Sequence, residues 1–65
     1  MSESEDIIGE ISFMLDGCLF LLDDLMDTLK KDGFSDYEGV AGLCYEFEAC
    51  IADGFDVLCK IRERL

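Results

Sequence analysis

The amino-acid sequence predicts an all-α fold, an antiparallel helical hairpin built as a single domain over residues 1–65. Two observations lead to this prediction. Apolar residues recur at intervals of three and four through two long segments, a spacing that places them along one side of an α-helix. A single short break, from Asp32 to Asp36, separates the segments. A connection of this length returns the second helix antiparallel to the first.

The first helix is predicted over about residues 4–32. Ser2 or Ser4 can cap its N-terminus, and acidic residues follow in its first turn. Lys30 and Lys31 stand in its last turn, where positive charge suits the helix dipole. The side expected to face the second helix consists of Ile8, Ile11, Leu15, Cys18, Leu22, Leu25 and Leu29.

The turn is predicted at residues 33–35. Gly33 can adopt the left-handed conformation that ends a helix, and the chain then folds back so that Phe34 can pack on Leu29. The first helix is therefore expected to stop within two residues of Gly33.

The second helix is predicted over about residues 36–65. Ser35 and Glu38 have the spacing of a capping box, which predicts where the helix begins. Gly54 interrupts the apolar pattern and is expected to let the facing helix approach closely. The side expected to face the first helix consists of Tyr37, Val40, Cys44, Phe47, Ile51, Gly54, Leu58, Ile61 and Leu65.

The apolar residues exceed what one hairpin can bury, because 51 % of the chain is hydrophobic. We therefore expect two copies to form a homodimeric four-helix bundle, in which Leu15, Leu22, Leu25, Phe47, Ile51 and Leu58 are nearly inaccessible. An obligate partner of another sequence would serve equally well. The residues expected to form the dimer or partner-binding surface are Phe13, Leu19, Phe20, Leu21, Met26, Leu43 and Phe55.

Phe13 and Phe20 fall on the far side of the first helix from its predicted facing side. Two interpretations stay open for them. They belong to a broad dimer interface, since heptad positions drift by about 20° per repeat on a straight helix, or they form a second surface for a partner.

Charge and composition exclude several classes of protein. The chain carries 16 acidic and 5 basic side chains, has no His, and has a net charge of −11. This charge opposes direct binding to nucleic acid and to anionic membranes. The N-terminus lacks the basic start of a signal peptide, and no apolar run is long enough for a membrane span. We therefore expect a cytoplasmic protein.

The four cysteines are expected to be free thiols that act as small apolar residues. They stand at positions 18, 44, 50 and 59, without a C-x-x-C pair and without a His to complete a zinc set. Because the two helices are expected to pair antiparallel about the turn, Cys18 should lie near Cys50. A disulfide between these two residues is therefore the most feasible one in an oxidising compartment. No cofactor or metal ion is predicted.

Acidic residues are expected to form a solvated face on the outside of the hairpin. Asp23-Asp24-x-x-Asp27 has the D-D-x-x-D form with which isoprenoid synthases hold Mg²⁺. The pairs Asp24-x-x-Asp27 and Asp53-x-x-Asp56 loosely resemble those of the all-α nucleotide pyrophosphohydrolases, although Asp stands where that pattern favours Glu. The predicted acidic face consists of Asp16, Asp23, Asp24, Asp27, Glu46, Glu48, Asp53 and Asp56.

These observations favour a small acidic interaction module or regulator that binds itself and another, unidentified protein, without catalysis. An alternative is an inhibitor of phage or plasmid origin that mimics nucleic acid and occupies a basic groove. A Mg²⁺-dependent nucleotide hydrolase that uses the aspartate pairs is the third hypothesis.

Overall fold

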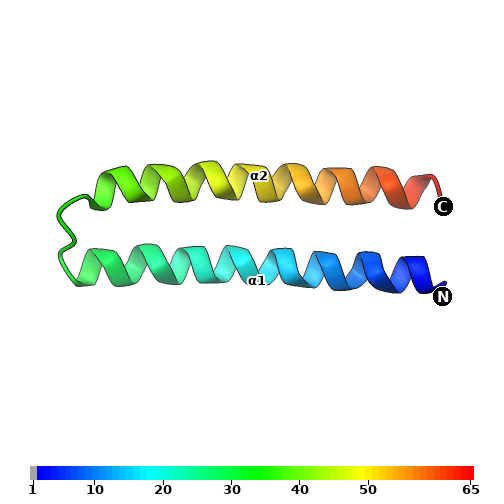
Figure 1. The fold of residues 1–65 in the computed structure, drawn as a ribbon, viewed down its shortest axis with the longest axis horizontal. Helices are drawn as coiled ribbons and strands as arrows, with labels where there is room; N and C mark the ends of the chain where they lie inside the picture. Colours follow the sequence, from blue (N-terminus) through cyan, green and yellow to red (C-terminus); the bar gives the residue numbers. More distant parts are fainter. Residues whose placement is uncertain (1) are drawn as a thin grey trace.

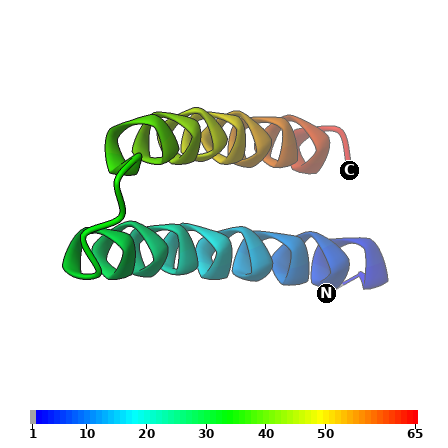
Figure 2. The same ribbon diagram turned by 60° about the vertical axis from the view of Figure 1, so that its left-hand side comes forward.

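The chain folds into an antiparallel helical hairpin, as the sequence predicts. The computed structural model describes residues 2–65, of which α1 spans Glu3–Lys31 and α2 spans Tyr37–Glu63. Within this range the chain is 88 % helix and has no strand. The helices run side by side, and the start of α1 and the end of α2 lie at the same end of the hairpin (Figures 1 and 2).

The N-terminus of α1 is capped by Ser2. Its backbone is extended, and its Oγ accepts a hydrogen bond of 3.2 Å from the backbone N–H of Glu5. Of the two serines that the sequence offers for this role, Ser2 is the one used.

The end of α1 forms a Schellman motif around Gly33, which confirms the predicted stop. Gly33 has a φ of 68°, in the left-handed region. Its N–H donates to the carbonyl oxygen of Lys30 at 3.2 Å, and the N–H of Phe34 donates to the carbonyl oxygen of Leu29 at 3.0 Å. These two bonds satisfy helix-end carbonyls and reverse the chain.

The predicted capping box at the start of α2 is wrong. The N-cap is Asp36, one residue later than Ser35, and its side chain makes no capping hydrogen bond with the described residues. A turn in which the N–H of Tyr37 donates to the carbonyl oxygen of Phe34 precedes the helix and delays its start. With Asp36 as N-cap, the residue that would complete a box is Gly39, which has no side chain.

The contact between the helices, which we call the seam, keeps the predicted spacing but is rotated from the predicted sides. Its α1 side consists of Ile8, Ser12, Leu15, Leu19, Leu22, Met26 and Leu29, and its α2 side includes Tyr37, Val40, Ala41, Cys44, Glu48, Ile51, Gly54, Phe55 and Leu58. Several residues predicted to face the other helix are exposed instead, namely Ile11, Cys18, Leu25, Phe47, Ile61 and Leu65.

The rotation has a physical reason in the sequence. Each helix carries two apolar stripes that are offset by one residue and have the same spacing, so that periodicity alone does not select one. The stripe used includes the small residue Ala41. A Cβ built at Gly54 would lie 3.6 Å from Cδ1 of Leu15, an ordinary van der Waals distance, so the packing of α1 does not require a glycine there.

A cluster of buried residues lies in the half of the hairpin next to the turn. Met26, Ala41 and Cys44 are buried together, and Leu22, Tyr37 and Val40 pack against them. The described chain has no side chain below 2 % exposure, so the seam is a thin layer rather than a closed core.

Gly33→Ala should lower the free energy of unfolding by about 1–2 kcal/mol, because Ala is strained at a positive φ. Chemical denaturation at one fixed protein concentration measures this change. The matched control is Gly17→Ala, inside α1, where an added Cβ meets no atom within 4 Å of the described structure. That variant should be more stable by about 0.5–1 kcal/mol. Equal effects of the two variants would contradict the assigned role of Gly33.

Candidate interaction surface

A continuous apolar surface covers one side of the hairpin, and we call it the apolar face. Most of its members stand one residue before a seam residue, whereas Ile61 lies beyond the last seam residue and Gly54 borders both surfaces. In an antiparallel pair such positions on both helices fall on the same side of the seam. From α1 they are Ile7, Ile11, Met14, Cys18, Leu21 and Leu25, and from α2 they are Leu43, Phe47, Cys50, Gly54, Val57 and Ile61. No charged residue interrupts either set.

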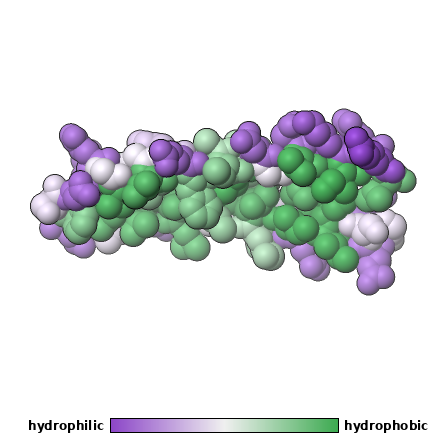
Figure 3. Space-filling view, turned by 45° about the horizontal axis from the view of Figure 1, so that its top comes forward, coloured by the Kyte–Doolittle hydropathy of each residue, from purple (hydrophilic) through white to green (hydrophobic). Residues whose placement is uncertain are grey.

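Figure 3 shows hydrophobic side chains gathered in a band along both helices, with hydrophilic side chains at its borders. Large side chains on the apolar face are well exposed, since Phe47 exposes 54 % of its surface and Leu21 exposes 68 %. Exposed apolar patches of this extent mark interaction sites in soluble proteins.

The other side of the hairpin, which we call the aromatic–acidic face, has a different chemistry. Its positions each stand one residue after a seam residue. Its aromatic members are Phe13, Phe20 and Tyr45, all exposed. Its acidic members are Asp16, Asp23, Asp27, Glu38 and Asp56, and Gly9, Lys30, Gly42, Ala49, Ala52 and Cys59 complete it.

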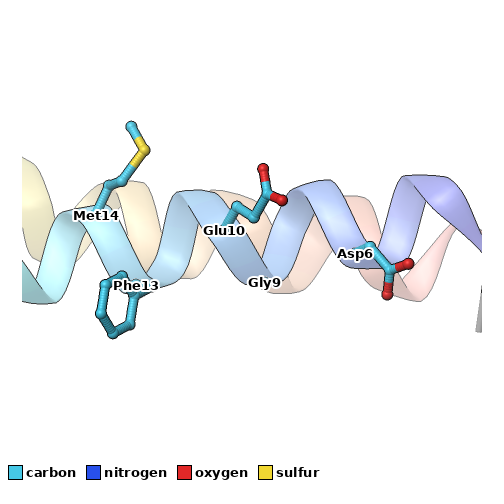
Figure 4. Close-up of a pocket in the computed structure, with 5 residues that line it drawn as sticks. All are labelled: Asp6, Gly9, Glu10, Phe13 and Met14. Carbon is cyan, nitrogen blue, oxygen red and sulfur yellow. The ribbon is translucent and has the colours of Figure 1, made fainter.

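Neighbouring residues thus belong to different faces of the hairpin. In Figure 4, Met14 and Phe13 project to opposite sides of α1. They border an open hollow of about 500 Å³ that is also lined by Asp6, Gly9 and Glu10. A second hollow, of about 460 Å³, lies on the outside of α2 among Leu43, Glu46, Phe47 and Cys50. Both are lined mostly by apolar atoms, which fits packing against another apolar surface.

The structure separates the residues that the sequence grouped as a dimer or partner surface. Leu21 and Leu43 lie on the apolar face, whereas Phe13 and Phe20 lie on the aromatic–acidic face. Leu19, Met26 and Phe55 belong to the seam instead, and Met26 is buried there. Five residues that the apolar spacing predicts in the seam are surface residues instead, namely Ile11, Cys18, Leu25, Phe47 and Ile61. The signal for them in the sequence is the second stripe, offset by one position.

Most of the predicted acidic face is exposed as expected, but Glu48 is an exception. Its side chain turns into the seam, where its Oε1 is buried and has no hydrogen-bond donor among the described residues. Burial raises the pKa of the Glu48 carboxyl, and the neighbouring Asp23 raises it further through a side-chain hydrogen bond and through its negative charge.

The remaining acidic residues make few contacts. Asp56 pairs with Lys60 at 3.0 Å, and both are well exposed, so this pair contributes little to stability. Asp24 and Asp53 stand at positions on the outer sides of α1 and α2, away from the seam, so the two aspartate pairs do not converge. Over residues 2–65, no group of three or more Cys, Asp or Glu is arranged to hold a metal ion.

The cysteines divide among the three surfaces. All four are free; Cys44 is buried in the seam, and the others are exposed. Cys18 and Cys50 lie on the apolar face, and Cys59 lies on the aromatic–acidic face.

Neither α1 nor α2 has a stretch long and apolar enough to cross a bilayer. No protein-family model, curated protein or solved structure gives a significant match to the chain.

Glu48→Gln should stabilise the protein at pH 7, because it removes a carboxylate charge that the seam and Asp23 disfavour. A raised pKa means that the folded state holds this proton more tightly than the unfolded state. The contribution of Glu48 to stability is therefore fully present below its ordinary value of 4.5 and is lost as the pH rises through the raised pKa. The gain from the substitution should shrink as the pH falls to 4.

Thermal denaturation between pH 4 and pH 8 measures this dependence. Glu46→Gln is the matched control, because it removes the same charge from an exposed position two residues away. The same pH dependence in both variants would contradict the statement that burial and Asp23 raise the pKa of Glu48.

Proposed function

We propose that the chain is a small acidic interaction module that binds another protein, performs no catalysis, and works as a homodimeric four-helix bundle. The observation that carries this proposal is the uncharged apolar face, which spans both helices and is left open by the seam.

The energetics favour association through this face. Burying one large apolar side chain contributes about 1.5–3 kcal/mol. The apolar face offers several such side chains in each chain, and a small domain is stable by only about 5–15 kcal/mol. Two chains of −11 repel each other, but salt screens exposed charges beyond about 8 Å at physiological ionic strength. Since the face itself carries no charge, no like charges are forced together at its centre.

The shape of the hairpin supports the same conclusion. Its radius of gyration is 15.2 Å, whereas a compact domain of this length is expected to have about 11 Å. Its Cα extents of 47 × 16 × 8 Å describe a slab one helix thick. Stacking a second layer of helices on the slab would supply the missing thickness of a bundle.

The aromatic–acidic face would remain open in such a dimer and is the proposed surface for another protein. Phe13, Phe20 and Tyr45 stand out from α1 and α2 among acidic side chains. Aromatic residues are enriched at protein interfaces, where they act as anchors.

A nucleic-acid mimic is the second candidate function. It is favoured by the acidic members of the same face, on which Lys30 is the sole basic residue. Binding of a basic partner by charge should weaken steeply between 50 and 500 mM salt, whereas binding through aromatic anchors should weaken little.

Leu21→Glu should convert the dimer to a monomer, because it places a charge on the apolar face. Light scattering at micromolar concentration measures the mass, which for the unaltered protein should be twice the chain mass of 7.3 kDa. Phe20→Glu is the matched control. Phe20 is as exposed as Leu21, at 72 % against 68 %, and the same charge is added on the other face.

The control variant should remain a dimer. A folded monomer for the unaltered protein, or dissociation of both variants alike, would contradict the proposed assembly through the apolar face.

A further inference from the structure

The middle of the apolar face is marked by two exposed thiols. Cys18 lies about halfway along α1 and Cys50 about halfway along α2. Because the helices are antiparallel about the turn, both cysteines lie at the same height of the hairpin. Both also belong to the apolar face, whereas the third exposed cysteine, Cys59, does not.

The area of the hairpin indicates what a partner must cover. Its accessible surface is 5115 Å², whereas a compact monomer of 7.3 kDa is expected to expose about 4,200 Å². The excess of about 900 Å² matches the area of about 800 Å² that each partner buries in a standard stable interface. The slab of 47 × 16 Å has room for an interface of this size on one face.

We infer that a second copy of this chain covers the apolar face, related to the first by a two-fold axis in the plane of the face, with Cys18 and Cys50 of both copies in one central layer. This inference rests on the proposed homodimer and adds how the two-fold axis lies and in which register the two copies meet. A second copy brings an uncharged face of the same length, which is the chemistry that the apolar face requires.

The central register follows from symmetry. For two elongated faces to overlap fully, an in-plane two-fold axis must run either across the helices or along them. Either rotation leaves mid-length residues at mid-length. Any shift along the helices would expose apolar side chains at both ends and lose part of the buried area. The two copies therefore meet with their middles aligned.

Disulfide crosslinking tests the inference with cysteines that the chain already has. Three variants each keep one exposed cysteine: Cys18 (Cys50→Ala with Cys59→Ala), Cys50 (Cys18→Ala with Cys59→Ala), and Cys59 (Cys18→Ala with Cys50→Ala). Buried Cys44 stays in all of them. Each variant, and a mixture of the first two, is oxidised in air with copper phenanthroline at micromolar concentration and run on a non-reducing gel. Circular dichroism checks that each variant is helical.

At least one of three samples should crosslink strongly: the variant that keeps Cys18, the variant that keeps Cys50, or the mixture of the two. We expect that sample to give at least tenfold more crosslinked dimer than the variant that keeps Cys59. Crosslinks between two copies of the Cys18 variant, or between two copies of the Cys50 variant, place the axis across the helices. Crosslinks that form only in the mixture place the axis along the helices.

Crosslinking through Cys59 at an equal or higher yield would overturn the inference, as would no crosslinking by any variant that light scattering shows to be a dimer. In those cases the proposed homodimer would stand and its face would be another one. A monomer by light scattering would instead remove the homodimer itself.

Discussion

A helix in a two-helix hairpin can bury only one side, because it has only one neighbour. Each helix of this chain has two apolar sides, offset by one residue, and only one of them lies in the seam. The other forms the apolar face, which the fold leaves open. The thin seam, the elongated shape and the large accessible surface all follow from this mismatch between apolar content and the one available contact.

The distribution of charge is compatible with that constraint. Sixteen acidic residues avoid the apolar face completely, and most stand on the outer sides and on the aromatic–acidic face. Glu48 departs from this rule, because its carboxyl turns into the seam beside Asp23. Burial and the negative charge of Asp23 disfavour the ionised carboxyl of Glu48, which weakens the hairpin at neutral pH and increases its dependence on contacts outside the seam.

The ends of the helices could be predicted from the sequence, whereas their rotation could not. Gly33 and Ser2 act through local backbone bonds, and local patterns therefore predicted the stop and start of α1. The start of α2 was missed by one residue, since a turn at Phe34 displaced the box at Ser35. Whether Leu25 or Met26 lies in the seam depends on packing against α2. Because both stripes have the same spacing, periodicity does not distinguish between them.

The central claim, that folding and association through the apolar face are linked, is tested most directly by the concentration dependence of thermal unfolding. A dimer that dissociates on unfolding is stabilised by mass action. The account predicts that the midpoint of unfolding rises steadily as the chain concentration increases from 1 to 100 μM, with a single transition throughout. A midpoint that does not change over this range would contradict the account, because the hairpin would then be stable alone with its apolar face exposed.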